Sequence, residues 1–414
     1  MSKTQNISDV FKNYKERFLY WPEYEISYST EGPETIVVIP AYHEDQLLTT
    51  LESLDQNKIG NKKVIVLVVL NYPVKLGEKW AEFHHVQYEI LNKSKKFYKS
   101  FELQVIQAFD LPEKRTGVGA ARKIGMDQAL KIFADSGSDG IIMCLDGDCT
   151  VSQDYLRTCT AYFADHKCNT LVVPFEHPTN NLDLLLREGI LAYELHLRYY
   201  KNALKWTGFP YAYHTVGSSM GVRASVYGKL GGMNRRRAGE DFYFLNKCFA
   251  YGGVIEMSGA TVYPSARVSD RVPFGTGRAQ EEWMKNKRYK NTYHFDCWRD
   301  LKLVFMGIDT LNQQYELQNV PEYVLSFFQE INFVERIHQI QSGSNNPGSF
   351  IKNFYHWFDG FLVMKFLNYL RDSVHGEMDV VEAAEELAKQ IDLPIEDGIG
   401  LELCLDTYRE LDKR

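Results

Sequence analysis

The chain has 414 residues, a formal net charge of −7 and a hydrophobic fraction of 44%. This length is sufficient for one large or two medium domains with a substantial buried core. The negative net charge argues against a nucleic-acid-binding protein, which would need a basic surface. Seven cysteines occur without a Cys-x-x-Cys pair, so neither a disulfide framework nor a zinc site is indicated, and a reducing compartment, the cytoplasm, is expected.

The beginning of the chain lacks the apolar segment of a secretory signal. The longest apolar run, Val64–Leu70, is far shorter than the roughly 20 residues that are needed to cross a bilayer. We therefore expect no transmembrane segment, and any contact with a membrane would be peripheral.

Residues 1–34 are predicted to form a helical extension, because aromatic and apolar side chains recur there at near-helical spacing. The β-branched apolar run Thr35–Pro40 predicts a first strand that ends at proline. A loop with Tyr42 and Glu44 follows, and an amphipathic helix through about Leu54 completes a βα unit.

The same alternation of strand and helix continues along the first half of the chain. Lys63–Leu70, Leu103–Phe109 and Gly140–Leu145 are predicted strands, and Val118–Phe133 is a predicted helix. This pattern is typical of an α/β fold with a mostly parallel sheet covered on both faces, in which ligands bind beyond the carboxyl ends of the strands. The polar side chains at those ends are Glu44, Asn71, Asp110, Asp146 and Asp148.

The strand Gly140–Leu145 leads directly into two carboxylates around a glycine, Asp146-Gly147-Asp148. Such oxygen ligands suit Mg²⁺ or Mn²⁺, and a bound phosphate can complete the coordination shell. We expect Gly147 to let the backbone turn sharply between them. Acidic pairs also occur as ordinary turn residues at the end of a strand. The motif by itself is therefore compatible with either a metal site or a structural turn.

Two later segments carry candidate binding residues. Gly217 and Ser218 lie in a run of small residues that permits close backbone approach to a ligand or another strand. Glu240 and Asp241 follow Gly239 and open a predicted helix. Acidic residues are also favoured there as structural helix caps, so this pair too has an ordinary structural interpretation.

A loop from Arg267 to Arg278 contains Arg271, Gly275 and Gly277 as well. Arginines between glycine hinges suit a lid that closes over phosphates, although arginines on loops are commonly only solvated. From about residue 280 the strand patterns fade and aromatic-rich helical patterns follow. The predicted division is thus an extension over 1–34, a sheet domain over 35–280 and a mainly helical region over 281–414.

Five short segments together resemble the family 2 glycosyltransferases of the GT-A fold. They are Val37–Glu44, Gly117–Arg122, Asp146–Asp148, Gly231-Gly232 and Gly239–Asp241. Each is weak alone, and their order and spacing carry the resemblance, which covers about Thr35 to Arg278. It implies a GT-A fold, with a mostly parallel, Rossmann-like central sheet, followed by the helical C-terminal region.

The resemblance also implies an activity. The chain would be an inverting glycosyltransferase that moves a sugar from a nucleotide-diphosphate donor to a carbohydrate or other hydroxyl acceptor, in polysaccharide biosynthesis. Asp146 and Asp148 would hold Mn²⁺ or Mg²⁺ with the donor diphosphate. Asp241 would be the general base, with Glu240 as its supporting carboxylate.

The resemblance also suggests which residues bind the substrate. Arg122 and Lys123 look like the basic residues that approach the nucleotide sugar in this family. For Lys123, the alternative is an ordinary position on the surface of the helix without a role in binding. The expected substrate-binding residues are Pro40, Tyr42, Glu44, Asn71, Gly117, Arg122, Asp146, Gly217, Ser218, Arg271 and Arg278.

The chain departs from the family pattern at Asn71, where many relatives place an acidic residue against the base. An amide still donates and accepts hydrogen bonds, so nucleotide binding is expected while the identity of the base is open. A third metal ligand is also unassigned. His294 is a candidate by position, although a histidine between Tyr293 and Phe295 is more commonly packed among aromatic rings.

Two other functions compete with sugar transfer. Asp146–Thr150 also matches the Asp-x-Asp-x-Thr motif of haloacid-dehalogenase-type phosphatases, in which Asp146 would be the nucleophile. That motif normally ends the first core strand, whereas several βα units precede it here. A non-catalytic nucleotide-sugar-binding protein is the third alternative, and the presence of both acidic pairs argues against it.

Overall fold

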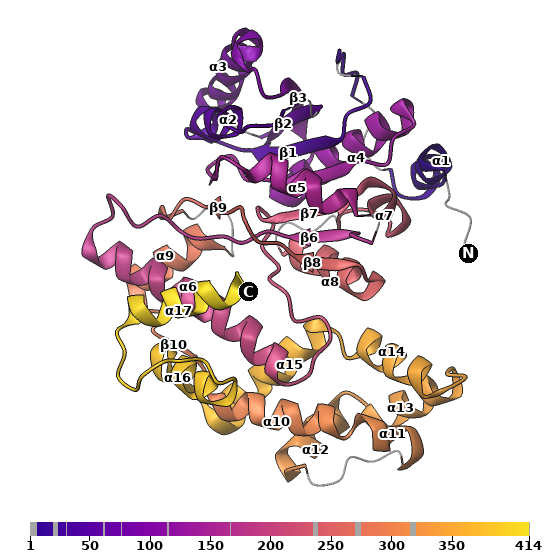
Figure 1. Ribbon diagram of the computed structural model, residues 1–414, viewed down its shortest axis with the longest axis vertical. Coiled ribbons are helices and arrows are strands. Elements are labelled where there is room, and N and C mark those ends of the chain that lie inside the picture. Colours follow the sequence, from indigo (N-terminus) through magenta and orange to yellow (C-terminus); the bar gives the residue numbers. More distant parts are fainter. Residues whose placement is uncertain are drawn as a thin grey trace. The chain divides into compact units, whose positions relative to one another are not determined.

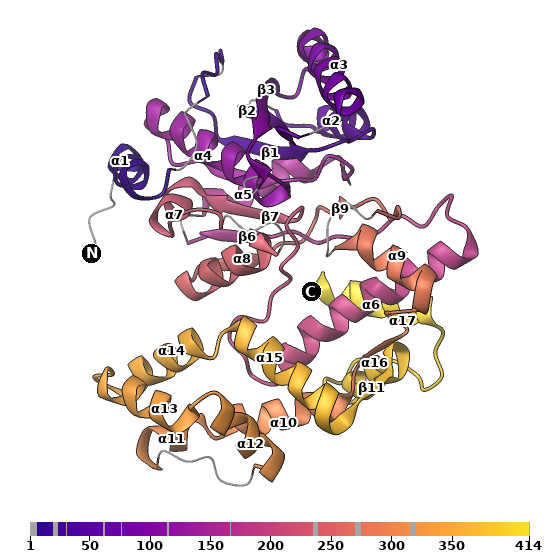
Figure 2. The same ribbon diagram turned by 180° about the vertical axis from the view of Figure 1, so that it is seen from behind.

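The computed structural model describes most of the chain and divides it into two compact units (Figures 1 and 2). The described residues are 6–19, 24–29, 31–60, 63–75, 77–113, 116–165, 167–234, 239–269, 275–314 and 320–413. The first unit comprises Met1–Pro178, Thr215–Arg278 and Lys413–Arg414, and the second comprises Thr179–His214 and Ala279–Asp412.

The first unit is built on a seven-stranded sheet with the order β3-β2-β1-β4-β7-β6-β8. The strands are β1 (Thr35–Ala41), β2 (Val64–Pro73), β3 (Glu102–Leu111), β4 (Ile141–Cys144), β6 (Thr170–Val172), β7 (Met220–Arg223) and β8 (Val254–Glu256). Strand β1 is parallel to β2 and β4, β2 is parallel to β3, and β6 is parallel to β8. Only β7 runs antiparallel to its neighbours β4 and β6. The predicted α/β class and mostly parallel sheet are confirmed.

Helices before and between the strands complete the first unit (Figure 1). They are α1 (Ile7–Arg17), α2 (Leu47–Asp55), α3 (Glu78–Ser94), α4 (Val118–Ser136), α5 (Tyr155–Ala164), α7 (Ala224–Lys229) and α8 (Glu240–Tyr251), and a small ribbon pairs β5 (Thr150–Val151) with β9 (Val262–Tyr263). Helix α4 packs against β1 and β2. A Cβ at its Gly125 would lie 3.0 Å from the Val69 side chain, so the glycine permits this close packing.

The N-terminal helix α1 exists as predicted, but it belongs to the first unit and is fixed there by a buried polar network. The Tyr14 hydroxyl donates to an Asp127 carboxylate oxygen at 2.6 Å, and the Lys123 ammonium lies 3.0 Å from the same carboxylate. Lys123 is 2% exposed. It therefore does not lie on the helix surface, so that interpretation of Lys123 was wrong, and its carboxylate partner in this network is Asp127.

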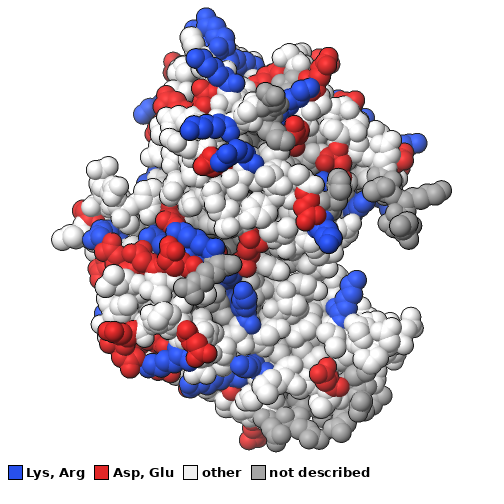
Figure 3. Space-filling view, in the orientation of Figure 1, with Lys and Arg blue, Asp and Glu red and all other residues white. Residues whose placement is uncertain are grey.

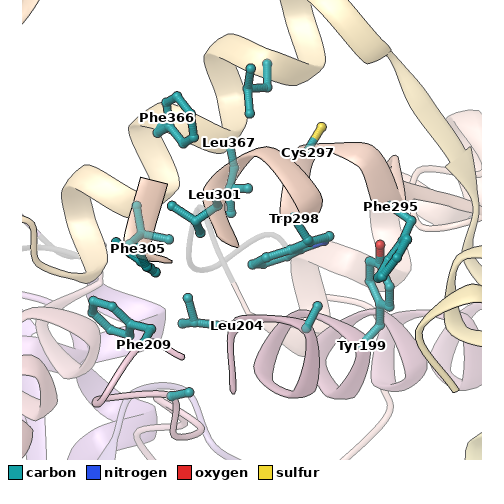
Figure 4. Close-up of a cluster of buried hydrophobic side chains, with 14 of the residues drawn as sticks. Tyr199, Leu204, Phe209, Phe295, Cys297, Trp298, Leu301, Phe305, Phe366 and Leu367 are labelled. Atoms are coloured by element: carbon teal, nitrogen blue, oxygen red, sulfur yellow. The ribbon is translucent and has the colours of Figure 1, made fainter. Parts of the chain in front are cut away.

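The second unit is mainly helical, as predicted for the C-terminal region. Its elements are α6 (Leu184–Trp206), most of α9 (Thr276–Asn286), α10 (Phe295–Met306), α11 (Ile308–Gln314), α12 (Glu322–Glu330), α13 (Phe333–Ser342), α14 (Pro347–Trp357), α15 (Gly360–Leu370), a π-helix (Arg371–His375), α16 (Val380–Gln390), α17 (Leu401–Asp412) and the antiparallel strands β10 (Asn291–Tyr293) and β11 (Glu377–Asp379). An aromatic-rich core holds them together. Figure 4 shows Trp298 of α10 and Tyr199 of α6 among the side chains of this core. The centroids of their two rings are 6.0 Å apart.

Helix α6 corrects the predicted domain division. The sequence placed residues 179–214 in the sheet domain, whereas the structure places them in the second unit, whose other part begins at Ala279. The cause is the apolar face of α6: Leu195 and Tyr199 are fully buried in the same core as Trp298 and Tyr408. Residues 179–214 thus interrupt the predicted block 35–280.

The described surface carries charges of both signs. Figure 3 shows acidic and basic side chains intermixed on the face that it presents, as is common on globular proteins. Across the described ranges, no helix combines the length and the apolar composition that crossing a membrane requires.

Candidate active site

The candidate site lies in the first unit, where β4 ends and β7 begins. Cys144, the last residue of β4, pairs with Met220, the first residue of β7. Because β7 is antiparallel to β4, the residues that follow β4 and those that precede β7 lie next to each other at the same end of these two strands. This explains how Gly217 is brought close to the turn that carries Asp146 and Asp148.

The Asp146-Gly147-Asp148 segment forms a compact turn. The Cys149 amide donates to the Asp146 carbonyl at 3.1 Å, and the Thr50 hydroxyl of α2 donates to the Gly147 carbonyl at 2.8 Å. Gly147 has no left-handed φ, so it is not required for a special backbone conformation. A Cβ there would lie 3.0 Å from the Glu44 side chain, and the glycine instead serves close packing.

Arg122 is the centre of a buried ion-pair network. The residue lies in the second turn of α4, and its side chain is only 4% exposed. Its guanidinium lies 2.5 Å from an Asp146 oxygen, 2.5 Å from a Glu240 oxygen and 4.0 Å from an Asp241 oxygen. Burial alone would lower the pKa of Arg122, but these carboxylates raise it well above its ordinary value. The guanidinium is therefore permanently charged.

Gly217 packs directly against this guanidinium. A Cβ at Gly217 would lie 2.7 Å from the guanidinium carbon of Arg122, closer than such atoms approach in proteins. The Gly217 amide also donates to an Asp241 carboxylate oxygen at 3.1 Å. The predicted close approach at this glycine therefore exists, and its partner within the described structure is an arginine side chain.

Glu240 and Asp241 occupy the first turn of α8, where the helix dipole favours negative charge. Burial raises the pKa of Glu240 to about 6, an effect that outweighs the opposing charge of Arg122. Burial likewise raises the pKa of Asp241. The Asp241 side chain is 25% exposed, against 2% for Glu240. Asp241 is therefore the more exposed carboxylate of the pair, and Glu240 is held by Arg122.

A second arginine forms a similar cluster beside the first. Arg267 follows β9, and its Nη2 contacts the carboxylate of Glu44 and lies 2.9 Å from an Asp148 oxygen. The two aspartates of the turn are thus bound by different arginines. The sequence identified Arg267 only as part of an arginine-glycine loop, and nothing local indicated that it pairs with residues of two distant strand ends.

The other predicted site residues differ in burial and in the contacts that they make. Asn71 is buried, with its amide nitrogen 3.5 Å from the Gly117 carbonyl, and the Tyr42 ring stacks on His43 at 4.0 Å. Pro40 is buried inside β1, and Ser218 is also buried. Arg278 lies half-buried in α9, and Arg271 lies outside the described residues.

The described residues were searched for side chains that could hold a metal ion. No group of three or more histidine, cysteine, aspartate or glutamate side chains that could hold a metal ion is found among them. Asp146 and Asp148 nevertheless remain 34% and 22% exposed, and two carboxylates plus diphosphate oxygens and water satisfy Mg²⁺. His294, the candidate for a third metal ligand, lies in the second unit. Its Nδ1 atom accepts a hydrogen bond from the Asp296 amide at 3.2 Å, so the residue serves as the N-cap of α10.

Comparisons with known proteins gave matches in structure alone. No family model and no curated protein matches the chain. Residues 1–349 of S. aureus TarS with UDP-GlcNAc are 12% identical with a TM-score of 0.41, over 73% of this chain and 82% of that chain. The same TarS segment with UDP is 13% identical with a TM-score of 0.39, over 92% and 90%.

GalNAc-T7 with UDP, GalNAc and Mn²⁺ is 13% identical with a TM-score of 0.38, over 75% of this chain and 58% of that chain. At these identities and TM-scores, the likeness transfers no residue role to this chain.

Proposed function

We propose that the chain is an inverting, metal-dependent glycosyltransferase that moves a sugar from a nucleotide-diphosphate donor to a hydroxyl acceptor. One observation carries the proposal: the Arg122 guanidinium lies 2.5 Å from both Asp146 and Glu240 and 4.0 Å from Asp241, so it joins the two acidic motifs. Two acidic groups with different chemical environments are thereby held at one site. Sugar transfer needs such a division, because one group must serve the leaving diphosphate and another the attacking hydroxyl.

Asp146 and Asp148 would serve the leaving group. Their partly exposed carboxylates would bind Mn²⁺ or Mg²⁺, which when bound neutralises the charge that develops on the departing diphosphate. Arg122 holds Asp146 in place, and the Thr50 hydroxyl holds the turn between the two aspartates. The carboxylates are therefore oriented before the donor arrives, which lowers the reorganisation needed during the reaction.

Asp241 would serve the nucleophile as general base. One of its carboxylate oxygens accepts a hydrogen bond from the Gly217 amide, and the other accepts one from the Phe242 amide at 2.8 Å. These two hydrogen bonds fix the orientation of the side chain. Its raised pKa brings its proton affinity closer to neutral pH, where a general base is most effective. A single displacement assisted by one base inverts the configuration at the anomeric carbon.

The direct test is incubation of the full chain with a panel of nucleotide sugars and Mn²⁺. We expect release of a nucleoside diphosphate with one donor, and NMR of the sugar product should show inverted anomeric configuration. Retained configuration would contradict the single displacement. No turnover of any donor would contradict the proposed function, and a phosphoryl group trapped on Asp146 would favour the phosphatase alternative instead.

A further inference from the structure

We propose that Arg267 is an exchangeable counter-cation, which neutralises Glu44 and Asp148 in the ligand-free site and turns to the donor diphosphate when a divalent cation binds Asp148. This inference rests on the proposed function and deepens it. It assigns to one side chain of the protein the role of competing with the metal ion and then of binding the anion that the metal accompanies.

The first support is the geometry of the contact. The same nitrogen, Nη2 of Arg267, contacts both the Glu44 carboxylate and the Asp148 carboxylate. The Glu44 side chain is only 6% exposed, so its charge is poorly hydrated. Two neighbouring carboxylates in such a place repel each other unless a cation lies between them. Arg267 provides that cation.

The second support is the difference from Arg122. The Arg122 side chain is 4% exposed and has three carboxylates and Gly217 around it, whereas the Arg267 side chain is 25% exposed and has two carboxylate partners. Water and ligands can approach Arg267 and Asp148, whose side chains are 25% and 22% exposed, but they cannot approach the Arg122 side chain. The contact of Arg267 can therefore be exchanged, and that of Arg122 cannot.

The third support is an unused donor. The Nε atom of Arg267 is buried, and it has no hydrogen-bond acceptor within the described residues. A buried N–H without an acceptor is unfavourable, and the planar guanidinium fork matches the spacing of phosphate oxygens. A diphosphate bound next to Asp148 would supply the missing acceptor and a new partner for the charge that leaves the carboxylates.

This arrangement makes metal binding and diphosphate binding interdependent. Without diphosphate, a divalent cation competes with Arg267 for Asp148 and binds weakly. With diphosphate, the guanidinium has an alternative partner, so the cation binds more tightly. Reciprocity requires that the cation strengthen diphosphate binding by the same factor.

The test compares Arg267→Gln with the wild-type chain in two binding measurements. Electron paramagnetic resonance of free Mn²⁺ gives the affinity for Mn²⁺ alone, and calorimetry at saturating Mg²⁺ gives the affinity for inorganic pyrophosphate. Loss of one charged hydrogen-bond partner should strengthen Mn²⁺ binding about tenfold and weaken pyrophosphate binding about tenfold. The matched control is Arg157→Gln, which removes an exposed arginine paired with Asp154 and should leave both affinities unchanged.

A second variant keeps the inference testable if Arg267→Gln does not fold. Arg267→Lys retains the charge but loses the planar fork, so we expect Mn²⁺ affinity near the wild-type value and weaker pyrophosphate binding. Unchanged or weaker Mn²⁺ binding in Arg267→Gln would overturn the inference, as would unchanged pyrophosphate binding or a wild-type chain that binds neither probe. Turnover of a nucleotide sugar by the wild-type chain together with any of these results would leave the proposed function standing and reject the role of Arg267 alone.

Discussion

The two arginine clusters of the first unit use the same chemical groups in different surroundings. Arg122 is buried among three carboxylates, and Arg267 is partly exposed between two. Removing one partner of a buried ion pair destabilises a protein by about 3–5 kcal/mol, whereas an exposed pair contributes about 0–1 kcal/mol. Burial thus separates a fixed scaffold from a replaceable partner, although both arginines bind aspartates of the same turn.

The largest effect is expected from Arg122→Met, which leaves the Asp146 and Glu240 carboxylates without their cation. We expect unfolding in urea to show a loss of about 3–5 kcal/mol, because Glu240 is buried and cannot regain its hydration. Arg267→Met should lose less than Arg122→Met in the same assay, because Arg267 and Asp148 are partly exposed and water can reach them, and only Glu44 is left as a buried carboxylate. Equal losses in the two variants would remove the distinction between the clusters.

A smaller effect is expected from Gly217→Ala. The added Cβ would lie 2.7 Å from the Arg122 guanidinium carbon, so the backbone or the arginine must move, at a cost of about 1–3 kcal/mol. The control is Gly77→Ala, where the added atom meets nothing within 4 Å. If Gly217→Ala unfolds at the same urea concentration as the wild type, the packing of Gly217 on Arg122 does not constrain the network.

The pH dependence of turnover should distinguish the Arg122 cluster from the Arg267 cluster in the folded protein. Burial raises the pKa of Asp241, so its carboxylate gains a proton, and base catalysis is lost, at higher pH than for an ordinary aspartate. Arg122 opposes this shift. We expect Arg122→Lys to move the acidic limb of the pH profile upward if the lysine sits farther from the carboxylates, and Arg267→Gln to leave the limb in place. A limb that moves with Arg267→Gln instead would contradict the assignment.

The stability of the fold should depend on the protonation of Glu240, the carboxylate next to Asp241. Burial raises the pKa of Glu240 to about 6 in the folded protein. The folded state therefore binds its proton more tightly than the unfolded state, and this contribution to stability is complete below the ordinary glutamate pKa and is lost as pH rises through about 6. Urea titrations of Glu240→Gln and wild type across this range should show a reduced pH dependence in the variant.

The sequence predicted the features that depend on neighbouring residues. Strand β1 is a continuous apolar run, the turn Asp146–Asp148 comes shortly after β4, and Glu240 begins a helix after Gly239. Each of these features can be recognised from adjacent residues in the sequence. The pairing of Arg267 with Glu44 spans 223 positions, and that of Arg122 with Glu240 spans 118. Contacts at such separations are set by the order of strands in the sheet, which local patterns do not specify.

The assignment of α6 failed for a related reason. Its apolar spacing correctly predicted a helix, but an apolar face does not indicate which part of the chain will cover it. The helices that share a core with α6, including α10, α16 and α17, follow about a hundred or more residues later in the sequence. Likewise, Lys123 is one residue from Arg122 on α4, and the helical rotation between them directs the two cations into different networks.

The central claim is that the site separates a leaving-group half from a base half, and Asp241→Asn tests it most directly. The substitution keeps the size of the side chain and removes its basicity, so steady-state turnover of the donor that the panel identifies should fall about 10²- to 10⁴-fold while donor affinity stays near the wild-type value. Asp135→Asn, an exposed carboxylate on α4, is the control and should be fully active. Wild-type turnover in Asp241→Asn would contradict the account.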